Sequence, residues 1–372
     1  MNKYNFYAPC LFGLEKPLAD ELRDMGAENV TAENGRVLFS GDDDILARAN
    51  ICSRYAERIG IQVGSFDALS FAALFDCIKA LPWEKYIGRK DAFPVKGWSL
   101  NSVLHSVPDC QSIIKKAIVN RLSEKYGITW FEESGATCRV SFSILKNRVS
   151  VCIDTSGEGL HKRGYRRDSN AAPIKETLAA AMVYFARIYN DSTVYDPFCG
   201  SGTILIEAAM AARNIAPGLR RSFAGESLPF IDGGAWQRAR ARAQDMIDNT
   251  VPFCAVGTDI DPAAVELTLH NAEKAGVAGC VKASVADVAD FSVPTARGVV
   301  ITNPPYGERM LELDEAERLY RVMGKVFTQR HGLRYAVISP DDRFEQLFGR
   351  PSDKRRKLYN GSIRCQLYMY YR

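Results

Sequence analysis

Residues 298–311 read GVVITNPPYGERML, and within them Asn303-Pro304-Pro305-Tyr306 says most about the fold. The apolar run at 299–301 is typical of a buried strand. Proline cannot donate to a sheet ladder, so the strand must end where the prolines begin. The pattern therefore predicts a stiff loop at a strand tip, where an amide side chain, a carbonyl group and an aromatic ring lie close together.

Such a loop has the groups needed to receive a planar molecule that carries an NH2 group. The side-chain oxygen of Asn303 and the carbonyl of Pro304 can accept its two N–H bonds, while the ring of Tyr306 stacks on its plane. A tight strand-to-loop turn without any chemistry would use the same residue types. The tetrad alone leaves both interpretations open.

A glycine-rich loop upstream reads DPFCGSGT over residues 196–203, and it precedes an alanine-rich helix expected at 204–212. Gly200 and Gly202 permit a tight turn and a close approach of the backbone to a ligand. No Gly-Lys-Ser/Thr follows, so this is not a P-loop, and Leu205 stands where G-x-G-x-x-G needs glycine. The acidic Asp196 suits a cationic ligand better than a diphosphate.

Two further expected strands end in carboxylates, at Asp259 and at Asp287. The ligand crevice of an open α/β sheet lies at the carboxyl ends of its strands, so all four motifs should converge there. Taken singly, each aspartate is an ordinary cap. About 60 residues separate the glycine-rich loop from Asp259, against roughly 20 in a minimal βαβ unit. We therefore expect an insertion or an added helical segment within 213–250.

The order of these four strand tips along the chain resembles the order found in class I S-adenosylmethionine-dependent methyltransferases. The resemblance implies S-adenosylmethionine as cofactor and a target amine held by the Asn-Pro-Pro-Tyr loop. The implied catalytic residues are Asn303, Pro304, Pro305 and Tyr306. The implied cofactor-binding residues are Asp196, Pro197, Phe198, Cys199, Gly200, Ser201, Gly202, Thr203, Asp259, Ile260, Asp287 and Asn303.

Four blocks narrow the resemblance: residues 154–166 (DTSGEGLHKRGYR), 172–179 (APIKETLA), 214–218 (NIAPG) and 303–309 (NPPYGER). They are similar to THUMP-domain-containing large-subunit (23S) rRNA guanine-N2 methyltransferases. This implies an rRNA (guanine-N2-)-methyltransferase whose partner is 23S rRNA, either naked or in an early assembly particle. The implied RNA-binding residues are Lys162, Arg163, Arg166, Arg167 and Arg309. Alternatives are another RNA such as tRNA, a protein glutamine, or a vestigial RNA-binding or assembly factor.

The expected fold class is α/β. A C-terminal Rossmann-like methyltransferase domain, with a mostly parallel seven-stranded sheet and an antiparallel last hairpin, follows α+β ferredoxin-like and THUMP regions. The expected boundaries are 1–60 for the ferredoxin-like region, 61–155 for THUMP, 156–170 for a linker and 171–372 for the methyltransferase. Periodicity predicts helices at 14–25, 71–80 and 110–126 and strands at 4–8, 59–63 and 98–103. Hairpins are expected at Asn34-Gly35, Lys146-Asn147 and Asn360-Gly361.

Composition agrees with an ordinary soluble globular chain, with 47% hydrophobic and 25% charged residues and a net charge of +4. Clustered Lys and Arg favour a nucleic-acid partner more than the net charge does. The ten cysteines form no C-x-x-C pair, so neither a metal site nor a disulfide framework is expected. Without an apolar run of membrane-spanning length, no membrane partner is expected, and the expected location is the reducing cytoplasm.

Overall fold

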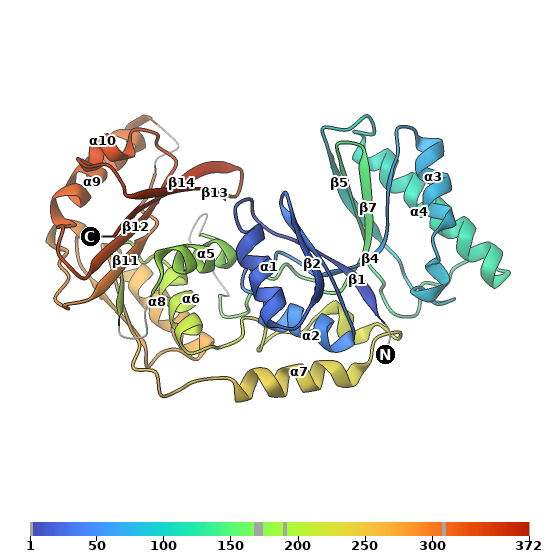
Figure 1. The fold of residues 1–372 in the computed structure, drawn as a ribbon, viewed down its shortest axis with the longest axis horizontal. Helices are drawn as coiled ribbons and strands as arrows, with labels where there is room; N and C mark the ends of the chain where they lie inside the picture. The colour runs from blue at the N-terminus through green and yellow to red at the C-terminus, as the bar shows by residue number, and fades with distance from the viewer. Residues whose placement is uncertain (1–2, 167–173, 189–191, 307–309, 372) are drawn as a thin grey trace. The chain divides into compact units, whose positions relative to one another are not determined.

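The computed structural model describes residues 3–166, 174–188, 192–306 and 310–371. Two compact units divide the chain (Figure 1). The first comprises residues 1–10, 17–160 and 222–242, and the second comprises 11–16, 161–221 and 243–372. Each unit has a seven-stranded sheet of its own.

The first unit has the strand order β2-β3-β1-β4-β7-β6-β5, in which only β5 and β6 pair in parallel. β1 pairs with β4 through Phe6 opposite Ile61 and Tyr7 opposite Gly60. The expected ferredoxin-like and THUMP regions therefore share one continuous sheet. Its strands are β1 (Tyr4–Pro9), β2 (Glu28–Glu33), β3 (Arg36–Gly41), β4 (Gly60–Asp67), β5 (Val95–Leu100), β6 (Val140–Leu145) and β7 (Arg148–Asp154).

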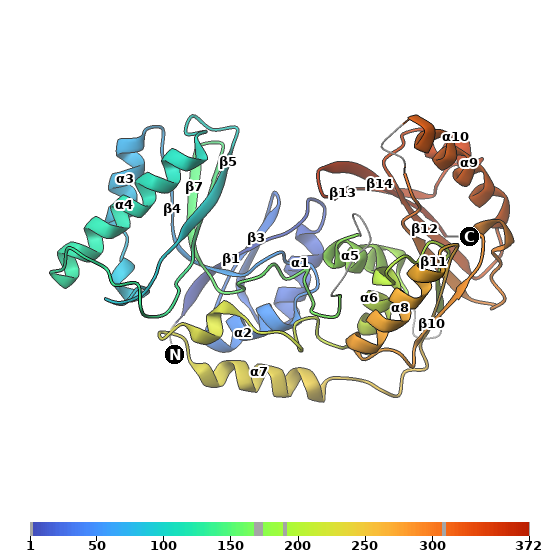
Figure 2. The same cartoon turned by 180° about the vertical axis from the view of Figure 1, so that it is seen from behind.

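The helices of the first unit are α1 (Glu15–Asp24), α2 (Asp43–Cys52), α3 (Phe71–Ala80) and α4 (Val107–Tyr126), with the 3-10 turn η1 (Trp83–Lys85). α3 and α4 pack together on one face of the β4–β7–β6–β5 part of the sheet (Figures 1 and 2). The predicted helix at 71–80 and the hairpins at Asn34-Gly35 and Lys146-Asn147 are confirmed.

The sequence pattern missed α2 and misplaced one strand. Asp42 begins α2, because its side chain accepts a hydrogen bond from the backbone N–H of Ile45 at 3.0 Å. The strand expected at 98–103 lies at 95–100, and α4 begins at Val107 with a proline in its first turn.

The second unit has the strand order β10-β9-β8-β11-β12-β14-β13. The five strands from β10 to β12 are parallel, while β14 is antiparallel to β12 and β13. This confirms the predicted fold class, including the last hairpin at Asn360-Gly361. The strands are β8 (Thr193–Asp196), β9 (Cys254–Asp259), β10 (Val281–Val285), β11 (Gly298–Thr302), β12 (Leu333–Ser339), β13 (Lys354–Asn360) and β14 (Ile363–Tyr370).

Helices cover both faces of this second sheet (Figures 1 and 2). α5 (Glu176–Ala186), α6 (Thr203–Ala212) and α8 (Pro262–Ala275) lie on one face, and α9 (Met310–Val326) and α10 (Phe344–Phe348) lie on the other. The 3-10 turn η3 (Val288–Asp290) follows β10. With both faces covered, the strand ends are the part of the sheet that stays open to ligands.

The long connection between α6 and β9 contains the predicted added helical segment. It holds the 3-10 turn η2 (Ala224–Ser227) and helix α7 (Gly233–Asp245). Residues 222–242 belong to the first unit, where Trp236 stacks on Phe223 at 5.3 Å between ring centroids and Arg238 pairs with Asp44 at 2.9 Å. The insertion therefore explains the long spacing between the glycine-rich loop and Asp259. The domain boundaries expected at residues 60, 155 and 170 stay predictions.

Within the described residues, no helix is long and apolar enough to cross a membrane.

Candidate active site at the strand ends of the second sheet

The glycine-rich loop joins β8 to α6 in a conformation that requires glycine. Gly200 and Gly202 have φ values of 52° and 76°. A Cβ atom on Gly202 would lie 2.8 Å from Cγ2 of Thr268 on α8, so space excludes a side chain there as well. The Thr268 hydroxyl donates to the carbonyl of Gly200 at 2.9 Å, and Asn271 donates to the carbonyl of Ser201 at 2.9 Å. Helix α8 therefore holds the loop in place.

Asp259 ends β9 and connects the glycine-rich loop to the start of α8. Its Oδ2 accepts from the backbone N–H of Gly200 at 2.9 Å, and its Oδ1 accepts from the N–H of Asp261 at 3.1 Å. A carboxylate offers about four lone-pair sites, so it can still receive hydroxyl groups of a ligand. The structure thus gives Asp259 a loop-holding role that the sequence did not reveal.

Asp196 links the glycine-rich loop to the Asn-Pro-Pro-Tyr loop. It is 1% exposed, and its Oδ1 accepts from the Thr302 hydroxyl at 2.7 Å and from the N–H of Phe198 at 3.1 Å. Burial raises the pKa of the Asp196 carboxyl to about 7, although these hydrogen bonds oppose the rise. Thr302 directly precedes Asn303, so one carboxylate connects the two loops. Sequence reasoning missed Thr302, whose only signal is a hydroxyl at the end of an apolar run.

The Asn-Pro-Pro-Tyr loop presents a buried hydrogen-bond acceptor. The side-chain Oδ1 of Asn303 is buried and accepts no hydrogen bond from the described residues. Leaving such an acceptor unpaired costs about 1–3 kcal/mol, which a donor on a ligand would recover. The side-chain amide of Asn360, at the end of β13, donates to the Tyr306 hydroxyl. Pro304 is buried and Pro305 is exposed.

Two apolar side chains are exposed at neighbouring strand tips. Ile260 follows β9 and is 71% exposed, and Val285 ends β10 and is 54% exposed. Asp287 lies next to Val285 and caps η3 by accepting from the N–H of Ala289 at 2.8 Å. Apolar side chains beside a carboxylate fit a flat aromatic ring with a polar edge. The sequence pointed to Ile260 and Asp287 but not to Val285.

The remaining predicted residues of the glycine-rich loop line its inner side. Pro197, Ser201 and Thr203 are buried, and the hydroxyls of Ser201 and Thr203 are 3.1 Å apart. Burial raises the pKa of the Cys199 thiol to about 12, which keeps it neutral, as expected of a small loop residue and not of a nucleophile. No group of three or more His, Cys, Asp or Glu side chains in the described part of the chain is arranged to hold a metal ion.

The structure corrects one predicted RNA-binding residue. Arg163 and Glu207 form an ion pair at 3.3 Å with side chains only 1% and 0% exposed, and the Tyr165 hydroxyl also donates to Glu207 at 3.2 Å. A guanidinium enclosed in this way has no surface to offer a phosphate. The prediction that Arg163 contacts RNA is therefore wrong.

The other predicted RNA-binding residues have different surroundings. Arg166 is largely enclosed, since its side chain is 14% exposed and pairs with Glu176 at 3.1 Å. Lys162 is exposed. Arg167 and Arg309 lie outside the described residues. Runs of basic residues alone do not reveal which side chains turn inward to meet a buried carboxylate such as Glu207.

The sequence matches three known domain families. Residues 163–369 match the family described as "RMKL-like, methyltransferase domain". Residues 5–60 match "RlmL ferredoxin-like domain", and residues 68–154 match "THUMP domain".

Individual relatives resemble the whole chain. YpsC of Bacillus subtilis (strain 168), whose name assigns it provisionally as an RNA methyltransferase, is 42% identical over all of this chain and 97% of YpsC. The ribosomal RNA large subunit methyltransferase K/L of Shewanella frigidimarina (strain NCIMB 400) is 32% identical over 99% of this chain, which spans only 52% of that relative.

A solved structure extends the likeness to the fold. SMU.472, described provisionally as a methyltransferase and solved in complex with SAH, has 40% identity and a TM-score of 0.93, covering 100% of this chain and 98% of SMU.472. The family resemblance predicted from the motifs is thereby confirmed. The chain belongs to the RMKL-like methyltransferase family, in the branch that carries an RlmL-type ferredoxin-like domain and a THUMP domain before the catalytic domain.

Proposed function

We propose that this protein transfers a methyl group from S-adenosylmethionine to the exocyclic N2 of a guanine in large-subunit rRNA. The observation that carries the proposal is the buried, unpartnered Oδ1 of Asn303 at the tip of β11. The name of the K/L relative supports rRNA as the substrate, and the SAH complex of SMU.472 supports S-adenosylmethionine as the methyl donor.

The strand ends fit this cofactor in three places. The glycine-rich loop lets the backbone approach the amino-acid part, while the buried Asp196 lies next to it as a countercharge. Asp259 keeps lone pairs for ribose hydroxyls beyond those that Gly200 and Asp261 use. Ile260 and Val285 offer apolar surface to the adenine ring, with Asp287 beside its amine. When bound, the cofactor supplies an electrophilic methyl group on a sulfonium.

The target amine is a poor nucleophile, because the N2 lone pair of guanine is delocalised into the ring. Asn303 Oδ1 and the carbonyl of Pro304 accept the two amine hydrogens, which favours a pyramidal nitrogen and aims its lone pair at the methyl group. The same oxygens stabilise the positive charge that grows on nitrogen during transfer. No strong general base is needed, since an alkylated ammonium loses its proton readily to water.

Tyr306 holds the base through its ring. A guanine must leave its helix to reach the loop, and an aromatic face compensates part of the lost stacking. The bond from Asn360 to the Tyr306 hydroxyl fixes the orientation of that ring before the base arrives. We propose Lys162 as a phosphate contact of the RNA, because it is the exposed member of the Lys162-Arg163 pair.

The test is to incubate the full chain with radiolabelled S-adenosylmethionine and, separately, unmodified large-subunit rRNA, small-subunit rRNA, tRNA and protein extract. We expect label in large-subunit rRNA, and nucleoside mass spectrometry should identify N2-methylguanosine. The matched control is Asn303→Ala, which should bind cofactor and RNA but transfer the methyl group more slowly, by on the order of a hundredfold or more. N6-methyladenosine as product, or label only in protein or tRNA, would overturn the assigned target.

A further inference from the structure

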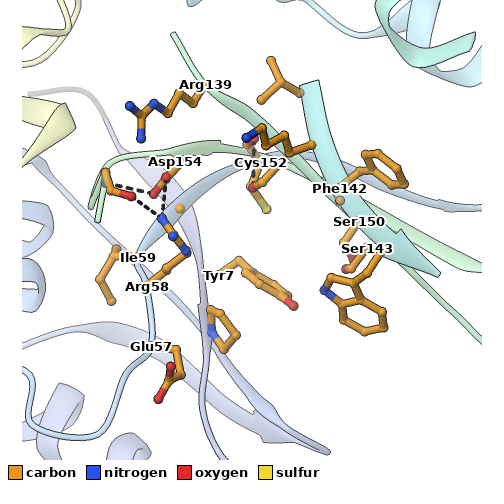
Figure 3. A pocket seen from close by; sticks show the side chains of 18 of the residues that line it. Tyr7, Glu57, Arg58, Ile59, Arg139, Phe142, Ser143, Ser150, Cys152 and Asp154 are labelled. Carbon is orange, nitrogen blue, oxygen red and sulfur yellow. Dashed lines mark hydrogen bonds and ion pairs between the residues drawn. The ribbon is translucent and has the colours of Figure 1, made fainter. Parts of the chain in front are cut away.

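The sheet of the first unit has a face that α3 and α4 leave uncovered, and this face is hollowed into a trough of about 690 Å³ (Figure 3). The trough lies across β1, β4, β7, β6 and β5, so it spans the ferredoxin-like and THUMP matches. None of its lining residues belongs to the methyltransferase site. A volume of this size is typical of sites for small organic molecules or parts of polymers, roughly 300–1,000 Å³.

Strand register explains why the sheet is hollow here. Trp98 lies opposite Ser143, which lies opposite Ser150 on β7. In the next row of the same face, Lys96 lies opposite Ser141, which lies opposite Cys152. On β6 and β7 these positions carry small side chains, while the edge strand β5 carries the large ones. The result is a low floor of hydroxyl and thiol groups beside an aromatic and cationic wall.

A third row completes the opposite wall. Tyr7 on β1 lies opposite Gly60, which lies opposite Asp154. Figure 3 shows the Tyr7 ring extending over the floor toward Ser143. Burial raises the pKa of the Tyr7 hydroxyl, and its hydrogen bond to Ser143 opposes that rise, so the ring is neutral and fixed in place. Trp98, on the other wall, is 45% exposed.

The charges around the trough favour an anionic polymer. Asp154 pairs with Arg58 at 2.8 Å, which neutralises the acid nearest the floor. Lys96 and Arg139 also line the trough, and neither forms an ion pair with any described residue. Glu57 is the remaining acid among the lining residues. The lining thus carries three cations, Arg58, Lys96 and Arg139, against two acids, and this excess of positive charge lies next to two aromatic side chains.

We propose that this trough binds unpaired nucleotides of the RNA substrate, with bases against Trp98 and Tyr7 and phosphates near Lys96 and Arg139. The assignment rests on the proposed function, which supplies RNA as the partner. Aromatic side chains on an open sheet stack unpaired bases, whereas the bases of a duplex are hidden in its stack. The floor serines are engaged within the protein, because Arg36 donates to the Ser150 hydroxyl at 3.4 Å and the Ser141 hydroxyl donates to the carbonyl of Cys152 at 3.4 Å. The walls and rim of the trough therefore supply the contacts to RNA.

The test measures binding of fluorescently labelled oligouridine and oligoadenine RNA to the full chain without cofactor. We expect single strands to bind and a duplex of the same length to bind more weakly. Trp98→Ala should weaken single-strand binding roughly five- to a hundredfold, the range for loss of one stacked base. Trp98→Phe keeps an aromatic ring and should restore most of the affinity. Trp130→Ala is the matched control, because Trp130 is 80% exposed but does not line the trough.

Salt dependence tests the phosphate contacts separately. Lys96→Gln and Arg139→Gln should each reduce the slope of log affinity against log salt concentration by about 0.7. Lys116→Gln removes the same charge from an exposed position on α4 and should leave the slope unchanged.

Equal single-strand binding by Trp98→Ala and Trp130→Ala would overturn the proposal, as would stronger binding of the duplex. Effective competition by a polyglutamate peptide would assign the trough to a protein partner instead. None of these measurements requires methyl transfer, so their outcome does not depend on which nucleoside is methylated.

Discussion

The two units each contain a seven-stranded sheet, but they use different parts of it. The second unit has helices on both faces, and its candidate site lies where parallel strands end. The first unit has helices α3 and α4 on one face, and its trough lies on the other face, across the middle of five strands. The candidate site of the second unit thus lies at the strand ends of its sheet, whereas the trough of the first unit lies on the open face of its sheet.

The difference follows from how the strands are connected. Parallel strands need crossover helices, which fill both faces and leave the carboxyl ends as the exposed part. Antiparallel strands can be joined by short turns such as Lys146-Asn147, so no helix has to cross the second face. A site at strand ends receives its side chains from loops, and Pro and Gly residues mark those loops in the sequence. A site on a sheet face receives its side chains from neighbouring strands, so the set of residues that meet there depends on strand register.

The largest effect is expected at Arg163, which belongs to the interior of the second unit. Arg163→Ala leaves Glu207 buried without its partner and should lower the free energy of unfolding by about 3–5 kcal/mol. Chemical denaturation followed by circular dichroism measures this loss. Lys162→Ala, one residue away and exposed, is the matched control and should change stability little. Similar stability of the two variants would contradict a stabilising role for the Arg163–Glu207 pair.

Asn303→Ala tests whether methyl transfer takes place at the strand ends of the second sheet. Removing one preorganised acceptor should reduce turnover by on the order of a hundredfold or more. Cofactor affinity and oligonucleotide binding at the trough should stay near wild type, since Asn303 holds neither loop through its buried Oδ1. Single-turnover rates combined with calorimetry separate these quantities. A variant that keeps its full rate would remove Asn303 from the reaction.

Asp259→Ala should weaken binding of S-adenosylmethionine by roughly 2–3 kcal/mol, through lost hydroxyl contacts and a loosened glycine-rich loop. Asp261→Ala serves as the control, because Asp261 caps α8 through the N–H of Ala263 but is not expected to touch the ligand. Calorimetry of both variants gives the comparison. Wild-type affinity in Asp259→Ala would contradict the ribose assignment.

Asp196 should make cofactor binding depend on pH. Its pKa in the folded protein, about 7, lies above the ordinary 3.8, so ionisation destabilises the fold progressively between about pH 4 and pH 7. If the ionised form receives the cationic ligand, affinity should rise roughly tenfold from pH 6 to pH 8. Asp196→Asn should flatten this profile and remove the loss of stability. An unchanged profile in the variant would show that another group titrates.

The smallest effect is expected at the Tyr306 hydroxyl. Tyr306→Phe keeps the stacking ring but leaves the Asn360 amide without its acceptor, so turnover should fall only several-fold, equivalent to about 1 kcal/mol. Tyr306→Ala removes the ring and should be far more damaging. Asn360→Ala should match Tyr306→Phe if the hydrogen bond acts only by orienting the ring. Steady-state rates on rRNA decide between these outcomes.

Local signals explain what the sequence predicted well. Prolines after an apolar run end β11, glycines turn the chain between β8 and α6, and single aspartates mark the tips of β9 and β10. Each feature depends on residues that are adjacent in the chain. The identity of the catalytic domain, its fold class and the position of its candidate site at the strand ends therefore followed from short motifs.

Contacts between distant residues required the tertiary structure. The bond from the Gly200 N–H to Asp259 spans 59 positions, and the Arg163–Glu207 contact spans 44. Whether a basic residue is buried depends on which carboxylate faces it, and no local pattern encodes that. The same reason hid Thr302, whose role appears only when β11 pairs beside β8.

The trough is the clearest case of what only the tertiary structure decided. In sequence, Ser143 and Ser150 are ordinary small residues in two apolar strands, and Trp98 stands on a third. They form a floor and a wall because β5, β6 and β7 pair in one register, and Tyr7 joins them because β1 pairs with β4. A shift by one residue would turn every one of these side chains to the helix-covered face. Residue types thus set which groups the chain could offer to a ligand, while strand register decided which of them meet.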